Sequence, residues 1–168
     1  DLTEVITVNH DLVSSYNADG YSEVVKQVIE SESPQTIVIG HSYQTRDFMP
    51  RVSAKLDIPF IPDIISLEDG FVKQVLNAKL NASVTTSADQ VILSFQSAMF
   101  SEEAMASGSC SSRSFDVNLD SSMVRAESEE PFQEAAGSVD LESAELLVSI
   151  GRGIEKEENI QTINFNSF

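Results

Sequence analysis

TIVIGHSYQTRDFMPRVSAKLD, residues 36–57, is the stretch that decides the fold of this chain. Its first five residues are apolar and largely β-branched, which is typical of a buried strand. The apolar residues that come later recur at helical spacing: Phe48, Val52 and Leu56. Pro50 is compatible with the first turn of such a helix. The pattern predicts a strand over 36–40 followed by a helix over 46–57.

The residues before this stretch show the same order of strand and helix. Residues 5–8, VITV, form a short apolar run that predicts a buried strand. Residues 21–32 place their aliphatic side chains on one helical face: Val24, Val25, Val28 and Ile29. Alternating strands and helices predict an α/β fold with a mostly parallel sheet flanked by helices.

The residues that follow predict further strands. Residues 58–65 form an extended run whose two prolines confine it to the ends or edges of a sheet: Pro59 and Pro62. Residues 71–76 and 82–87 alternate well enough to form an added antiparallel pair. Residues 90–95, QVILSF, give the clearest strand signal of the chain.

From Ser101 to Pro131 the chain becomes rich in serine and poor in large apolar residues. We interpret this part as surface connections around one short strand, FDVNL, at 115–119. A helix or turn is expected at 132–136. The apolar run near the end of 140–151 then predicts a strand that opens a new unit.

Charge and composition exclude several classes of function. Twenty-seven Asp and Glu against ten Lys and Arg give a formal net charge of -17. Nucleic acids and anionic membrane surfaces are bound through cationic groups, so we expect no nucleic-acid partner. The sequence contains no apolar run of about eighteen residues, so we predict no transmembrane span. The single cysteine, Cys110, excludes an internal disulfide framework and favours a reducing, intracellular compartment.

Two histidines come directly after or close to predicted strands. In a parallel sheet the carboxyl ends of neighbouring strands converge, so His10 and His41 could form a metal or catalytic pair. No third ligand has suitable spacing, and loop hydrogen bonds are the favoured role of His41. Ser42 fits a local turn better than a nucleophile. We therefore predict no metal site and no catalytic residue, and Cys110 alone does not change this.

A Gly-Arg-Gly sequence, Gly151 to Gly153, follows the last apolar run. Glycine lets the backbone approach a ligand or reverse direction, and Arg152 carries a fork of donors suited to phosphate or carboxylate. Such a turn is a weak signal by itself, so its meaning depends on the residues around it.

Three patches in order resemble the electron transfer flavoprotein alpha subunit. SAELLVSIGRGIEKEENI, from residue 143, is similar to the family pattern S-A-x-[IL]-V-V-S-G-G-R-G-x-x-x-x-E-N, with Ile150 in place of the first glycine. FMPRVSAKLDIPFIPDI, from residue 48, is similar to L-P-R-V-A-A-x-L-D-x-P-x-x-[ST]-D-[IV], and QVILSFQSAMF resembles a further family strand. The resemblance implies a Rossmann-like first domain with added antiparallel strands.

The resemblance also implies a division of the chain and a role for each part. Residues 1–143 are expected to be an incomplete first, scaffold domain, residues 144–160 the start of an FAD-binding domain, and residues 161–168 an unmatched tail. The chain is thus expected to be truncated at both ends relative to the family. Gly151, Arg152 and Gly153 are the expected cofactor-binding residues, although FAD is not expected to be held by this chain alone.

The family resemblance implies an electron carrier rather than a catalyst with its own substrate. A heterodimer with the electron transfer flavoprotein beta subunit would take electrons from acyl-CoA and other flavin dehydrogenases and deliver them to a membrane oxidoreductase or quinone pool. The expected location is the bacterial cytoplasm, or the mitochondrial matrix in a eukaryote.

Two other functions stay open at this point. An adenine-nucleotide-binding hydrolase or stress-protein-like domain would place His10 and His41 toward a phosphate, although no G-x-G-x-x-G or Walker loop is present. The chain could instead be a purely structural interaction fragment that binds no cofactor.

Overall fold

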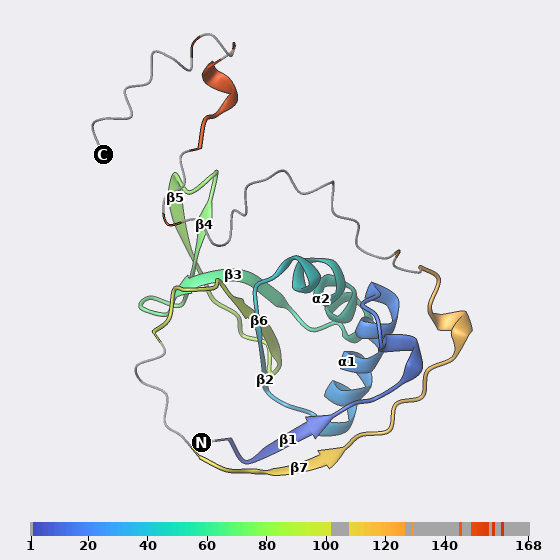
Figure 1. The fold of residues 1–168 in the computed structure, drawn as a ribbon. Helices are drawn as coiled ribbons and strands as arrows, with labels where there is room; N and C mark the ends of the chain where they lie inside the picture. The colour runs from blue at the N-terminus through green and yellow to red at the C-terminus, as the bar shows by residue number, and fades with distance from the viewer. Residues whose placement is uncertain are drawn as a thin grey trace. The chain divides into compact units, whose positions relative to one another are not determined.

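The structure is a computed structural model that describes residues 2–101, 108–126, 129, 145, 149–154, 156 and 159. The chain divides into two compact units, Asp1–Glu129 and Glu130–Phe168. We describe each unit by itself (Figure 1).

The first unit contains two helices and seven strands among its described residues. In chain order these are β1 (Glu4–Thr7), the 3-10 turn η1 (Asp11–Val13), α1 (Ala18–Glu32), β2 (Thr36–Gly40), α2 (Tyr43–Leu56), β3 (Phe60–Ser66), β4 (Phe71–Val75), β5 (Leu80–Val84), β6 (Val91–Phe95), β7 (Ser111–Ser114) and the 3-10 turn η3 (Ser121–Met123). Five strands form one sheet in the order β2-β6-β3-β4-β5, while β1 and β7 form a second, two-stranded sheet.

The Rossmann-like α/β fold expected from the sequence is confirmed. β6 lies between β2 and β3 and pairs in parallel with both. β4 pairs antiparallel with β3 and with β5, so the predicted antiparallel pair is present as an extension of the parallel part. β1 and β7 also pair in parallel, which makes three of the five strand pairs parallel.

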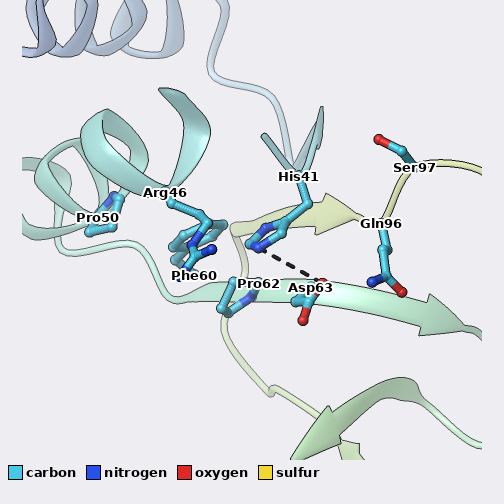
Figure 2. A pocket seen from close by; sticks show the side chains of 8 residues that line it. All are labelled: His41, Arg46, Pro50, Phe60, Pro62, Asp63, Gln96 and Ser97. Carbon is cyan, nitrogen blue, oxygen red and sulfur yellow. Dashed lines mark ion pairs between the residues drawn. The ribbon is translucent and has the colours of Figure 1, made fainter. Parts of the chain in front are cut away.

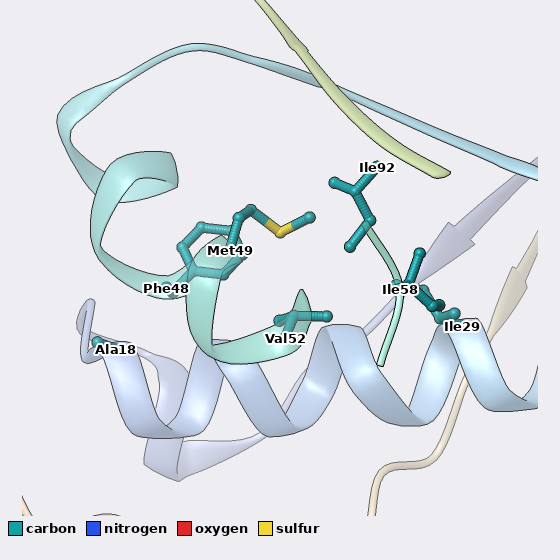
Figure 3. Packing of buried hydrophobic residues seen from close by; sticks show 7 residues of the cluster. All are labelled: Ala18, Ile29, Phe48, Met49, Val52, Ile58 and Ile92. Atoms are coloured by element: carbon teal, nitrogen blue, oxygen red, sulfur yellow. The ribbon is translucent and has the colours of Figure 1, made fainter. Parts of the chain in front are cut away.

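Both helices contribute side chains to one buried cluster that also includes Ile92 of β6 (Figure 3). The buried cluster between the helices and the sheet consists of Ala18, Ile29, Phe48, Met49, Val52, Ile58 and Ile92. A second cluster lies on the opposite face of the sheet and consists of Ile61, Ile64, Val91 and Leu93. β6 contributes side chains to both clusters, which explains why its sequence is a nearly continuous apolar run.

α1 starts where a buried side chain caps it. Asn17, which is 8% exposed, accepts a 2.7 Å hydrogen bond from the backbone N–H of Gly20. At the other end Ser33 takes the left-handed conformation, with φ 46°, and its N–H bonds the carbonyl of Ile29. The helix therefore begins three residues before the predicted start at 21 and ends at the predicted residue 32.

Replacing Gly20 by alanine is expected to destabilise the chain. A Cβ at this position would lie 2.7 Å from Asn17 Oδ1 and 2.8 Å from Val13 Cγ1. Alanine normally stabilises a helix interior by about 0.5–1 kcal/mol relative to glycine. Here the crowding costs about 1–3 kcal/mol and reverses the sign. Urea unfolding measures the difference, and Gly40→Ala, where a Cβ meets nothing within 4 Å, is the control. A gain in stability for Gly20→Ala would contradict the expectation.

α2 starts earlier than the sequence predicts. Ser42 caps it by accepting a 3.1 Å hydrogen bond from the N–H of Thr45, so the expected local role of Ser42 is confirmed. Because the helix begins at Tyr43, Pro50 is its eighth residue, and the prediction that this proline lies in the first turn is wrong. Pro50 has no N–H to donate to the carbonyl of Arg46, one turn earlier.

The prediction that Pro62 confines its strand to the end or edge of a sheet is wrong, because β3 lies between β6 and β4. The pairing of β3 with β6 shifts register between Ile61 and Ile64, and Asp63 there has φ 63°. A bulge removes the need for a ladder N–H, so proline is tolerated inside the sheet. Pro62 thus occupies a bulge, the third position that tolerates proline besides the end and the edge of a sheet.

The first predicted strand is present as β1, but it does not join the five-stranded sheet. It pairs instead with β7, whose sequence SSRS carries no apolar signal. Arg113 of β7 donates to Glu4 of β1 at 2.8 Å and to Glu32 of α1 at 2.6 Å. These ion pairs hold a strand that hydrophobic patterning could not reveal.

The predicted strand at 115–119 is wrong, since the structure has no strand there. Its apolar residues are half-buried in alternation, as a strand pattern requires. Its first residue, Phe115, still donates its backbone N–H to the carbonyl of Thr7 in β1 at 2.9 Å. Further along, the backbone N–H of Asn118 donates to the side chain of Gln27 in α1 at 2.9 Å, so the strand ladder does not continue.

The described part of the second unit contains a 3-10 turn, η4 (Arg152–Ile154). The N–H of Ile154 donates to the carbonyl of Gly151 at 3.2 Å. The helix or turn expected at 132–136 and the apolar residues of the strand expected near the end of 140–151 lie outside the described residues.

Candidate functional site

The expected cofactor-binding residues lie at η4. Gly151 precedes this turn and Gly153 lies within it, and both are exposed. A Cβ added to either glycine would meet no atom within 4 Å, and neither has the positive φ that requires glycine. Nothing within the described part of the second unit therefore demands these glycines, and their backbone is open to a ligand. This geometry is compatible with the close approach of a cofactor.

The first unit has a cavity at the carboxyl ends of β2 and β6, beside the first half of β3 (Figure 2). Its volume is about 740 Å³, and it is lined by His41, Arg46, Pro50, Phe60, Pro62, Asp63, Gln96 and Ser97. His41 directly follows β2, and Gln96 and Ser97 directly follow β6. Open α/β sheets bind ligands at this edge, so the cavity is the candidate site of the first unit.

A buried serine orients the histidine and the aspartate of this cavity. Ser94, which is fully buried, accepts a 3.2 Å hydrogen bond from the N–H of Asp63. Its oxygen also lies 2.8 Å from His41 Nδ1. In the tautomer in which the Ser94 hydroxyl donates to Nδ1, His41 carries its own proton on Nε2. Nε2 lies 3.8 Å from Asp63 Oδ1, which is too long for a hydrogen bond.

Arg46 supplies the positive charge of the cavity. Its guanidinium lies 6.0 Å from the ring centroid of Tyr43, a cation–π arrangement in the first turn of α2. Among the described side chains Arg46 has no ion pair, whereas Arg51, Arg113 and Arg125 each have a carboxylate partner. This arginine therefore has its donors available to an anion from solution.

A separate charge network joins α1, α2 and the segment after η3. Asp19 accepts a 2.9 Å hydrogen bond from Arg51 and a 3.0 Å hydrogen bond from the backbone N–H of Arg125. The bond from the Arg125 backbone lowers the pKa of Asp19 below its ordinary value of 3.8. The Arg125 and Arg51 guanidinium groups lower this pKa further, against the opposing effect of burial. Arg51, from the second patch of family resemblance, thus has a structural role.

Acid is expected to weaken the fold through Asp19. Because its folded pKa is lower than its unfolded pKa, ionised Asp19 contributes stability above pH 3.8, and this contribution is lost as the pH falls through the folded pKa. The difference in unfolding free energy between the natural chain and Asp19→Asn should therefore shrink between neutral pH and pH 3. Urea unfolding at several pH values measures it. Asp89→Asn, in an exposed loop, is the control for the loss of one carboxylate. A constant difference for Asp19→Asn would contradict the expectation.

The structure separates the two histidines that the sequence placed at one edge. β1 and β2 belong to different sheets, so His10 and His41 do not share a sheet edge. His10 instead caps η1, where its Nδ1 accepts a hydrogen bond from the N–H of Leu12. His41, for which loop hydrogen bonds were expected, bonds Ser94 inside strand β6 instead, and it also lines the cavity. Cys110 is an exposed free thiol.

Sequence reasoning missed Arg46, Asp63 and Ser94 as site residues. Asp63 matches the last aspartate of the family pattern in the patch that begins at residue 48, and this match could have indicated a site residue. Ser94 gave no signal, because a serine inside an apolar strand has a partner only once the fold brings His41 and Asp63 to it. Within the described part of the chain no group of three or more His, Cys, Asp or Glu side chains could hold a metal ion. The described helices also include none that is long and apolar enough to cross a membrane.

Comparison with known proteins assigns the family. The sequence model of the electron transfer flavoprotein domain matches residues 1–120, which is most of the chain and includes every residue that lines the cavity. The chain belongs to the electron transfer flavoprotein domain family. The match confirms the family resemblance found in the sequence and does not favour a nucleotide hydrolase.

Individual relatives agree with this assignment. An electron transfer flavoprotein subunit alpha of Bacillus subtilis (strain 168) is 30% identical over 166 residues, covering 95% of this chain and 50% of the relative. A probable mitochondrial electron transfer flavoprotein subunit alpha of Cryptococcus neoformans is 26% identical over 168 residues, covering 97% and 48%. An acryloyl-CoA reductase electron transfer subunit beta of Anaerotignum propionicum is 25% identical over 187 residues, covering 92% and 51%. The chain spans about half the length of these relatives.

Proposed function

We propose that this chain is the scaffold part of an electron transfer flavoprotein of the alpha type. The observation that carries the proposal is the family match over residues 1–120, supported by relatives named as alpha subunits. In this proposal the protein pairs with an electron transfer flavoprotein beta subunit. The pair accepts electrons from acyl-CoA and other flavin dehydrogenases and passes them to a membrane oxidoreductase or quinone pool.

FAD is the proposed cofactor, and it supplies the electron-carrying chemistry when bound. Residues 1–143 would form the scaffold and the beta-subunit contact, residues 144–160 would begin the FAD-binding part, and residues 161–168 would be a tail. Gly151 and Gly153 would let the backbone come close to the cofactor, and Arg152 would bind its pyrophosphate oxygens or hold the junction between the two parts. The protein is then an electron carrier of the bacterial cytoplasm or the mitochondrial matrix.

Absorbance spectra of two preparations test this proposal. The chain is purified alone and after co-expression with a beta subunit, and the near-ultraviolet and visible absorbance of each is recorded. A stable complex with the beta subunit and no flavin band in the chain alone would support the scaffold role. A flavin band in the chain alone would overturn the expectation that this chain does not hold FAD by itself. Failure to form any complex would overturn the proposed pairing with a beta subunit.

A further inference from the structure

The cavity at the carboxyl ends of β2 and β6, beside the first half of β3, is lined only by residues of the first unit, whereas the proposed FAD-binding residues belong to the second unit. Its volume of about 740 Å³ lies within the range of about 300–1,000 Å³ that is usual for sites of small molecules. We propose that this cavity binds a small organic oxyanion, a carboxylate or a phosphate monoester, with the oxyanion on Arg46 and His41 and the apolar body on Phe60 and Pro62. This inference does not depend on the proposed function.

The first argument concerns the charge of Arg46. The chain has a formal net charge of -17, and the other three arginines whose side chains the structure describes all bind carboxylates. Arg46 has no carboxylate partner among the described residues even though acidic groups are abundant. Its exposed guanidinium is positioned by Tyr43 and lines the cavity. The planar fork of arginine suits the two oxygens of a carboxylate or phosphate.

The second argument concerns hydrogen-bond donors beside Arg46. Nδ1 of His41 is bonded to Ser94, so Nε2 is the ring nitrogen left for a ligand, and it can donate in the tautomer in which Ser94 donates to Nδ1. Asp63 Oδ1, 3.8 Å away, is too far to accept a hydrogen bond from it. The side chains of Gln96 and Ser97 also line the cavity, and neither makes a hydrogen bond to another described residue. The histidine is only 14% exposed at its side chain, so its direction is fixed by the fold.

The third argument concerns the apolar wall and the opposing charge. Pro50, Phe60 and Pro62 supply an apolar surface between the polar groups. Figure 2 shows Arg46 and Asp63 on opposite sides of His41. An oxyanion is therefore attracted to the Arg46 side and repelled from the Asp63 side, which orients the ligand. An inorganic ion alone would leave the apolar wall without a contact.

NMR titration of the whole 168-residue chain tests the site. The probes are benzoate and phenyl phosphate, with benzyl alcohol as the neutral analogue, all at constant ionic strength. We expect saturable shifts of the His41 ring signals and of the Gln96 and Ser97 amides with at least one anionic probe. Tighter binding of benzoate would identify a carboxylate site, and tighter binding of phenyl phosphate a phosphate site. Absence of saturable shifts with both anions, or equal shifts with benzyl alcohol, would overturn the proposal.

Three variants make the test specific. Arg46→Gln should weaken binding about tenfold or more, because it removes a charge-assisted hydrogen bond. Lys79→Gln removes the same charge from an exposed position between β4 and β5 and should leave the affinity unchanged. Asp63→Asn keeps a residue type that tolerates positive φ and removes the repelling charge, so it should tighten binding. Equal weakening by Arg46→Gln and Lys79→Gln, or weaker binding to a folded Asp63→Asn, would show that the anion does not bind here.

Discussion

Arg152→Gln is expected to weaken flavin binding about ten- to a hundredfold in whichever form of the protein carries the flavin, the chain alone or its complex with a beta subunit. The variant keeps the length and polarity of the side chain but removes its charge. A charge-assisted hydrogen bond contributes about 1.5–3 kcal/mol, and a forked arginine can make two of them to one pyrophosphate. The open backbone at Gly151 and Gly153 leaves space for such an approach.

Flavin fluorescence titration measures this effect, and Lys79→Gln is the matched control for the loss of one positive charge. Thermal unfolding separates the two roles proposed for Arg152. If this arginine contacts FAD, the flavin affinity falls and the unfolding temperature of the flavin-free protein is unchanged. An unchanged flavin affinity would rule out the contact, and a lower unfolding temperature in that case would assign Arg152 to the junction.

Ile92→Ala is expected to lower the free energy of unfolding by about 2–5 kcal/mol. Ile92 is fully buried in β6, and its side chain lies in the cluster formed with Met49 and Val52 of α2 (Figure 3). Removing its outer carbons loses burial and leaves a cavity between the helices and the sheet, which a rigid parallel strand cannot collapse to fill.

Urea unfolding followed by circular dichroism measures this loss. Val38→Ala is the control, because Val38 on the neighbouring strand β2 is 64% exposed and should change stability by no more than about 0.5 kcal/mol. Equal losses for the two variants would contradict the assignment of Ile92 to the core.

The proposed oxyanion site and the proposed electron-transfer role fail independently. The first rests on the side chains of one cavity, and the second on the family match over residues 1–120. A chain that bound no anion could still pair with a beta subunit. A chain that bound an anion at Arg46 would gain no support from that result for a flavin at Arg152.

The main elements of the fold could be predicted because their signals are local. β2 has the predicted bounds, and β6 differs from its prediction by one residue at its start. The apolar run of β6 reflects burial on both faces, whereas β2 is exposed at alternate residues, including Val38. The start of α2 was missed by three residues, because Ser42 caps the helix through hydrogen bonds with Thr45 and not through hydrophobic periodicity.

The sequence by itself determined the strand and helix order, the antiparallel extension and the family, because each of these is written in contiguous residues. Only the tertiary structure decided that β1 pairs with β7 and that Pro62 lies at a bulge inside the sheet. It alone brought His41, Asp63 and Ser94 together from three parallel strands. The physical reason is that backbone ladders and buried polar contacts join residues far apart in the chain, and their partners leave no periodic trace in the sequence.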